Sequence, residues 1–113
     1  MRFLLRSKIH RARVTEANLD YVGSVTIDKD LVEKVGLMGG EKVLITSIDS
    51  GARLETYVIV GEAGSGVICM NGPTAHLIKK DEIVVIMGFE LTDQRIKPKV
   101  IIVDEHNNFV EYI

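Results

Sequence analysis

Short runs of β-branched and other apolar residues, separated by clusters of glycine, aspartate and serine, recur along most of this chain. They include VLITSI, LETYVIV, VICM and KPKVIIV, and the turn sequences DSGAR and EAGSG separate the first three. Strands at intervals of roughly ten residues are typical of an all-β sandwich or a small barrel. The gaps are too short for the crossover helices of βαβ units. The sequence therefore predicts a mainly β fold.

The N-terminal segment alternates between two kinds of side chain. One parity is mostly small or apolar, and the other holds polar groups as far as His10, which places Lys8 and His10 on one face of a strand. A short helix is expected over KDLVEKV, with Asp28 as its N-cap and Gly36 at its end. We expect TEANLD to form a turn, and NGPTAH to form a loop that opens a short helical turn through LIKK.

Length and charge limit the classes of protein that this chain can belong to. Its 113 residues predict a single domain, residues 1–113, with a thin core that oligomerisation would help to bury. A formal net charge of −2 argues against nucleic-acid or membrane partners, although a basic first strand leaves a DNA-binding barrel as one alternative. No signal peptide or membrane span is apparent, so we expect a cytoplasmic protein. The single cysteine, Cys69, lies in an apolar run and is expected to be a buried, inert thiol.

The stretch YVGSVTID places a glycine and a serine, Gly23 and Ser24, inside a short strand. Glycine in a strand commonly marks a bulge, so a noncatalytic ligand-binding barrel remains an alternative at this point. The motifs of phosphate-binding loops, zinc proteases and zinc ribbons are absent, and the three histidines show no close pairing, so no metal site is predicted.

Four segments together resemble a known family. They are KIHRARVT at 8–15, Tyr21-x-Gly23-Ser24, Arg53-x-x-Thr56-Tyr57 and NGPTAH at 71–76. In order and spacing they resemble the aspartate 1-decarboxylases, pyruvoyl-dependent enzymes of pantothenate biosynthesis, and the resemblance extends from Phe3 to about Phe89. Four motifs in register are far more specific than any one of them.

The resemblance implies that the chain cuts itself between Gly23 and Ser24. The hydroxyl of Ser24 would attack the Gly23 carbonyl, with Thr56 as hydrogen-bond donor to the oxyanion, and glycine would tolerate the unusual backbone geometry. The resulting ester would eliminate and lose ammonia, leaving a pyruvoyl group at position 24. The products would be a β chain, residues 1–23, and an α chain, residues 24–113.

The resemblance also implies the substrate and the residues that hold it. L-aspartate would form a Schiff base with the pyruvoyl group and lose its α-carboxylate to give β-alanine and CO2, without metal or pyridoxal phosphate. The implied substrate-binding residues are Arg53, Lys8, Asn71, Gly72, Pro73 and Thr74. Tyr57 would return a proton to the product, and His10 and Tyr21 would be neighbours of the site.

The family fold is a small double-psi β-barrel, here expected to have six to eight strands and one or two short helices. Its assembly is a homotetramer with active sites shared between subunits. Two positions depart from the family pattern: Val22 replaces an acidic residue that many members carry, and Pro73 removes one backbone N–H. The residues leave open whether a maturation factor assists the cut, and whether an amino acid other than aspartate is used.

Overall fold

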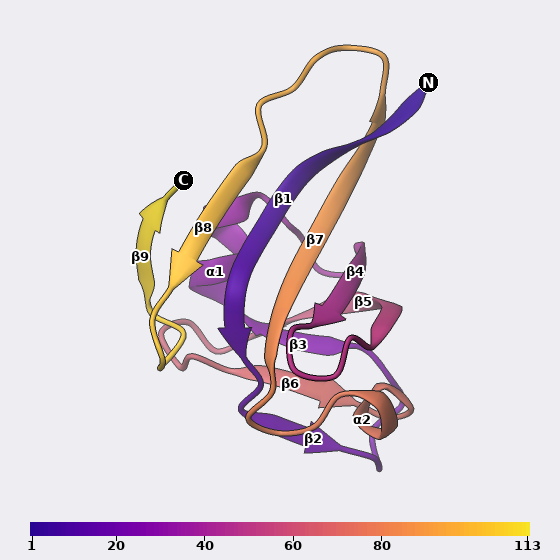
Figure 1. Cartoon of the computed structure of the whole chain (residues 1–113), viewed down its shortest axis with the longest axis vertical. Coiled ribbons are helices and arrows are strands. Elements are labelled where there is room, and N and C mark those ends of the chain that lie inside the picture. The colour runs from indigo at the N-terminus through magenta and orange to yellow at the C-terminus, as the bar shows by residue number, and fades with distance from the viewer.

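The computed structural model describes residues 1–113 as one nine-stranded sheet with two short helices (Figure 1). The helices are α1 (Lys29–Val35) and α2 (Thr74–Leu77). The strands are β1 (Arg2–Arg13), β2 (Glu16–Asn18), β3 (Val25–Asp28), β4 (Lys42–Ser47), β5 (Arg53–Gly61), β6 (Ile68–Asn71), β7 (Ile83–Thr92), β8 (Lys99–Val103) and β9 (Phe109–Tyr112). Their order in the sheet is β2-β6-β3-β5-β4-β7-β1-β8-β9. The predicted mainly β fold is confirmed. Neither helix has the length and apolar character needed to cross a membrane.

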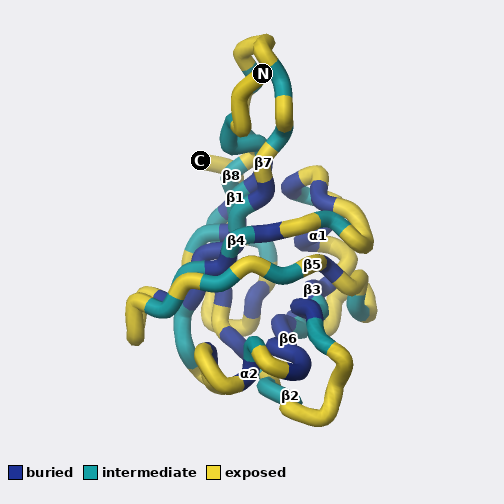
Figure 2. Tube along the Cα trace, turned by 90° about the vertical axis from the view of Figure 1, so that its right-hand side faces the viewer, coloured by how far each residue is buried: buried dark blue, intermediate teal, exposed yellow.

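A row of isoleucines crosses the middle of the sheet and forms the centre of the core. Ile9 of β1 is level with Ile101 of β8 and with Ile86 of β7, and Ile86 is in turn level with Ile45 of β4. All four side chains are completely buried. Burying one such side chain contributes about 1.5–3 kcal/mol, so this row is a principal source of stability. Figure 2 shows the buried residues along the inner parts of the strands and the exposed ones in the connections.

The alternation predicted for the first strand is present and has a structural reason for ending at His10. Ser7 and Ile9 are buried, whereas Lys8 and His10, which alternate with them, are partly exposed. The pairing of β1 with β7 shifts register between Ile9 and Ala12, and Arg11 has a positive φ of 63°. This bulge returns Ala12 to the core face after one extra residue.

Two local predictions were wrong. The segment TEANLD, which was expected to be a turn, contains β2, and this strand pairs in parallel with β6. The pairing is extended at Thr15, whose hydroxyl donates to the carbonyl of Ile68 and accepts from its N–H. This strand brings the count to nine, above the expected six to eight. The helical turn predicted through LIKK begins earlier, as α2 at Thr74. The carbonyls of Gly72 and Pro73 already accept hydrogen bonds from the backbone N–H groups of Ala75 and His76.

Asp28 caps α1 as predicted and also ties the helix to the turn between β5 and β6. Its Oδ1 accepts from the backbone N–H of Asp30 at 2.8 Å and of Gly64 at 3.1 Å, and its Oδ2 accepts from that of Gly66 at 2.8 Å. Gly36 ends the helix in the left-handed conformation, also as predicted. Because Asp28 is 3 % exposed, water cannot replace these bonds if the carboxylate is removed.

We therefore predict that Asp28→Ala lowers the free energy of unfolding by about 3 kcal/mol, from the lost cap and the unsatisfied buried N–H groups. Urea denaturation measures this change. Asp30→Ala is the matched control, since it removes the same charge from an exposed position in the first turn of the same helix. Equal losses for the two variants would contradict the role given to Asp28.

Candidate functional site

The backbone at Gly23 and Ser24 has an unusual conformation immediately before β3. Gly23 has a φ of 142° and Ser24 a φ of 91°, a region that residues with a side chain rarely adopt. Holding a non-glycine residue there costs about 1–3 kcal/mol. The chain also passes at this point from the surface to the interior, since Val22 is 96 % exposed and Ser24 is 1 % exposed. The peptide between Gly23 and Ser24 is therefore strained, and the serine that follows it is withdrawn from water.

Asn71, at the end of β6, holds Ser24 through both its backbone and its side chain. Its backbone N–H donates to the carbonyl of Ser24 at 3.0 Å, and its Nδ2 donates to Ser24 Oγ at 3.0 Å. The same Nδ2 donates to Thr26 Oγ1, and Asn71 Oδ1 accepts from the thiol of Cys69, each at 3.0 Å. The structure thus brings the predicted residues Ser24 and Asn71 together and adds two residues that the sequence analysis did not place in the site.

Thr26 and Cys69 belong to the site because of strand alternation. They are direct partners in the antiparallel pairing of β3 with β6. Ser24 lies two residues before Thr26, and Asn71 two residues after Cys69, so the four side chains share one face of the pair. The alternation within each segment was visible in the sequence, but the register that joins the two segments was not. Cys69 is buried, as predicted.

The turn after Asn71 approaches the Gly23 backbone closely. Gly72 has a φ of 64°, and its N–H donates to the carbonyl of Asn18 at 2.7 Å. A Cβ at this position would lie 2.6 Å from the carbonyl oxygen of Tyr21 and 2.9 Å from the nitrogen of Gly23. Pro73 follows as the N-cap of α2, where a missing N–H is tolerated, and Thr74 Oγ1 donates to the carbonyl of Asn71 at 2.8 Å. Glycine is therefore required at position 72 by both conformation and space.

β5 places Thr56 and Tyr57 beside the same peptide. β3 pairs in parallel with β5 and Val25 is level with Val58, so residue 24 lies beside Tyr57, one step earlier. The side chain of Tyr57 is on the outer face and is 42 % exposed, whereas Thr56 is only partly exposed. Gly23, Ser24, Asn71 and Gly72 therefore form one local group, and the register of β3 with β5 brings Tyr57, with Thr56 before it, toward that group.

The predicted basic residues do not join this group within one chain. Arg53 is exposed on β5, four residues before Tyr57, which corresponds to about 13 Å of extended strand. It lines a groove of about 700 Å³ together with Phe3, Lys42 and Phe89. Lys8 is level with Met87 of β7, which is level with Leu44 of β4. It therefore lies two strands from β4 and three from β5, about 14 Å across the sheet.

His10 also lies apart from the group, on β1 beside Ile102 of β8. Its Nδ1 is buried without a hydrogen-bond partner. Burial, together with the charges of Lys8 and Arg11, lowers the pKa of the imidazole below its ordinary value. The ring is therefore neutral at neutral pH.

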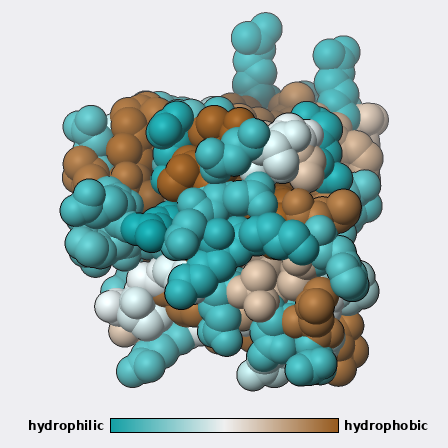
Figure 3. All heavy atoms as spheres, turned by 60° about the horizontal axis from the view of Figure 1, so that its bottom comes forward, coloured by the Kyte–Doolittle hydropathy of each residue, from teal (hydrophilic) through white to brown (hydrophobic).

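Exposed apolar side chains surround the site. The segment that leads to it carries Leu19, Tyr21 and Val22, and α2 carries Leu77, all more than half exposed. Figure 3 views the molecule toward the end where β2 and α2 lie, and hydrophobic atoms there form several groups between the hydrophilic ones. Several large apolar side chains exposed close together are typical of surfaces that contact another chain.

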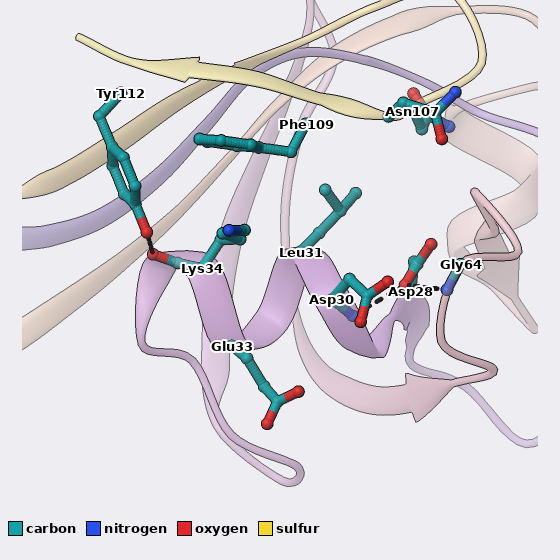
Figure 4. A pocket seen from close by; sticks show the side chains of 10 residues that line it. Asp28, Asp30, Leu31, Glu33, Lys34, Gly64, Asn107, Phe109 and Tyr112 are labelled. Carbon is teal, nitrogen blue, oxygen red and sulfur yellow. Dashed lines mark hydrogen bonds between the residues drawn. The ribbon is translucent and has the colours of Figure 1, made fainter.

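A second hollow, of about 620 Å³, lies between α1 and the C-terminal strand (Figure 4). The Lys34 ammonium is 4.4 Å from the centre of the Phe109 ring, and Tyr112 OH donates to the carbonyl of Lys34 at 2.8 Å. Its exposed carboxylates, Asp30 and Glu33, belong to the helix surface. These contacts fasten the C-terminal strand to α1, and we assign no chemistry to the hollow.

Comparison with known proteins gives consistent results. Residues 1–110 match the family described as Aspartate decarboxylase. Aspartate 1-decarboxylase of Anoxybacillus flavithermus is 51% identical over 99% of this chain and 91% of that protein, and the one of Corynebacterium efficiens is 53% identical over 97% and 84%. The crystal structure of the rationally designed protein mkDPBB_sym_86 superposes with a TM-score of 0.57 at 23% identity, over 77% of this chain and 96% of that one. This likeness confirms the predicted double-psi β-barrel.

The geometry at Gly72 generates a prediction about stability. Gly72→Ala adds a methyl group against the backbone of Tyr21 and Gly23, and we expect it to lower the melting temperature by more than Gly51→Ala does. Gly51 is the matched control because its φ of 75° is similar but nothing lies within 4 Å of the added Cβ. Both variants carry the conformational cost of about 1–2 kcal/mol, and only the first carries the clash. Equal melting temperatures for the two variants would show that the backbone of Tyr21 and Gly23 moves away from the added methyl group without loss of stability.

Proposed function

This chain belongs to the aspartate decarboxylase family and is a decarboxylase, and we propose that it makes a pyruvoyl cofactor from its own Ser24. With this group it converts L-aspartate into β-alanine and CO2, which supplies β-alanine for pantothenate synthesis. The observation that carries the proposal is the Gly23–Ser24 peptide, in which two consecutive residues have positive φ and the serine hydroxyl is buried against Asn71.

The residues at this peptide fit the formation of a pyruvoyl group. Ser24 Oγ attacks the carbonyl carbon of Gly23, and the bond to the Ser24 nitrogen breaks, so the amide becomes an ester. Elimination then leaves the oxygen on the new Gly23 carboxylate and a double bond at residue 24, and water replaces the nitrogen, which departs as ammonia. No oxidant is required. The backbone strain at Ser24 favours the cut because the free ends can relax afterwards.

The neighbouring side chains have separate roles in this scheme. Thr56, on the strand beside the cut, is the proposed donor to the oxyanion that develops on the Gly23 carbonyl. When formed, the pyruvoyl group supplies a carbonyl that binds the substrate amine and accepts the electrons released with CO2. Tyr57, level with residue 24 on β5, is the proposed source of the proton that the product gains. The Asn71 amide and the Gly72 turn orient the substrate.

We assign the recognition of the substrate carboxylate to basic residues of a neighbouring subunit. Arg53 and Lys8 have the chemistry to bind a dicarboxylate, and the planar guanidinium suits a carboxylate best. Strand spacing puts the backbones of both residues more than about 10 Å from Tyr57 of the same chain, and we therefore propose that a second copy presents them. A homotetramer that shares its sites meets this requirement and covers the exposed apolar side chains around Tyr21 and Leu77.

Intact-mass measurement of the denatured protein tests the cut. We expect two chains, residues 1–23 and 24–113, and the larger one should carry a blocked N-terminus. The summed mass of the two chains should equal that of the uncut chain plus one water and minus one ammonia. Ser24→Ala is the matched control and is expected to stay in one piece, because it lacks the attacking oxygen. A wild-type chain that stays intact after prolonged incubation would contradict the proposal, and so would a larger chain that begins with free serine.

Substitution of Arg53 tests substrate recognition separately from the cut. Arg53→Gln is expected to lower kcat/KM for aspartate by roughly 10- to 100-fold, because it removes a charge-assisted hydrogen bond to the substrate carboxylate. The extent of self-cleavage is expected to stay unchanged. Decarboxylation rates per cleaved chain, measured with aspartate and with glutamate, provide the test. Arg95→Gln, an exposed arginine in the connection between β7 and β8, is the matched control. Normal kcat/KM in Arg53→Gln would remove Arg53 from the site.

A further inference from the structure

The side-chain amide of Asn71 has two ends of similar shape and opposite hydrogen-bonding character. Its oxygen only accepts and its nitrogen only donates, so a rotation by half a turn would present the wrong group to residue 24. Asn71 is 2 % exposed, and water is not available to satisfy a misplaced group. The contacts around it must therefore distinguish the two ends.

Cys69 distinguishes the oxygen end. Its thiol donates to Asn71 Oδ1 at 3.0 Å, from a position two residues earlier on the same face of β6. Burial, with an added contribution from the nearby Glu16 carboxylate, raises the pKa of this thiol to about 11. The sulfur therefore keeps its proton at neutral pH and remains a donor.

Thr26 holds the nitrogen end. Its Oγ1 accepts from Asn71 Nδ2 at 3.0 Å, while the second N–H of the same nitrogen points to Ser24 Oγ, also at 3.0 Å. Thr26 and Cys69 are direct partners across β3 and β6, so the two contacts approach the amide from adjacent strands. Together they fix both ends of the amide without help from Ser24.

The self-cleavage proposed above changes this arrangement in one respect. The Oγ of Ser24 leaves on the carboxylate of Gly23, and Asn71 loses one of its three side-chain partners. The contacts with Cys69 and Thr26 do not involve the departing oxygen and remain. One N–H of Asn71 then points toward residue 24 without a partner in the chain, and it is available to an acceptor oxygen of the substrate.

We propose that Cys69 and Thr26 are positioning residues, which keep the Asn71 amide turned with its free N–H toward residue 24 in the processed enzyme. The proposal rests on the proposed function and extends it to two side chains that do not touch the reacting atoms. A thiol and a hydroxyl that pack without this role would tolerate any apolar replacement of the same size.

The test compares apolar and conservative variants at both positions. Cys69→Ala and Thr26→Val remove the hydrogen-bonding group, whereas Cys69→Ser and Thr26→Ser keep one. We expect kcat/KM for aspartate, expressed per pyruvoyl group counted by mass, to fall roughly three- to tenfold in the apolar variants. In Cys69→Ser and Thr26→Ser it is expected to stay within about twofold of the wild type, and this rescue separates positioning from packing.

A second measurement does not depend on activity. With asparagine labelled by ¹⁵N, the four asparagines give a small set of side-chain amide signals, and Asn71→Asp identifies the one from Asn71. We expect the Nδ2 protons of Asn71 to exchange with water at least about fivefold faster in Cys69→Ala and Thr26→Val, because each lost bond frees the amide. Exchange in the two serine variants should match the wild type.

Three results would overturn the proposal: unchanged kcat/KM in both apolar variants, an equal loss in the serine variants, or lower kcat/KM with unchanged amide exchange. Failure of the proposed function is recognised separately, because a wild-type chain that is never cut yields no pyruvoyl group to count. In that case the exchange measurement still tests the contacts, since the uncut chain contains both of them.

Discussion

The pairing of the short strand β3 with two neighbours is the constraint on which the site depends. β3 has four residues, and Val25 at its start is level with Val58 of the parallel strand β5 and with Met70 of the antiparallel strand β6. This double pairing fixes residue 24 between Tyr57 on one side and Asn71 on the other. Backbone register thus brings together groups from three separated segments of the chain, and the side chain of Asn71 adds its hydrogen bond to Ser24.

The site also combines local strain with a rigid surrounding. Ser24 occupies a backbone conformation that costs about 1–3 kcal/mol, and such a conformation persists only where neighbouring structure determines it. The buried isoleucines of β1, β4, β7 and β8 and the bonds from Asn71 provide that structure. A chain of 113 residues can therefore hold a strained peptide in place, and strand pairing would keep the two products of the proposed cut together.

Local features of the fold were predictable from the sequence, and nonlocal ones were not. The N-cap at Asp28 and the stop at Gly36 depend on residues close in the chain, as does the alternation in β1. The strand at Glu16–Asn18 was missed because its stability comes from parallel pairing with β6, more than 50 residues away. Ser24 and Asn71 were predicted only through the family resemblance. The contacts of Asn71 with Thr26 and Cys69 require the β3–β6 register, which one sequence does not contain.

Reductive trapping with labelled aspartate shows whether residue 24 carries the carbonyl group that binds the substrate. The protein is incubated with uniformly ¹³C- and ¹⁵N-labelled aspartate and cyanoborohydride, and the 24–113 chain is then weighed and fragmented. We expect a stable adduct on residue 24 that carries the labelled nitrogen. It should hold three labelled carbons if decarboxylation preceded reduction, and four if reduction came first. Absence of label from residue 24, in a preparation that releases labelled CO2 from aspartate, would place the chemistry elsewhere and contradict a pyruvoyl group at this position.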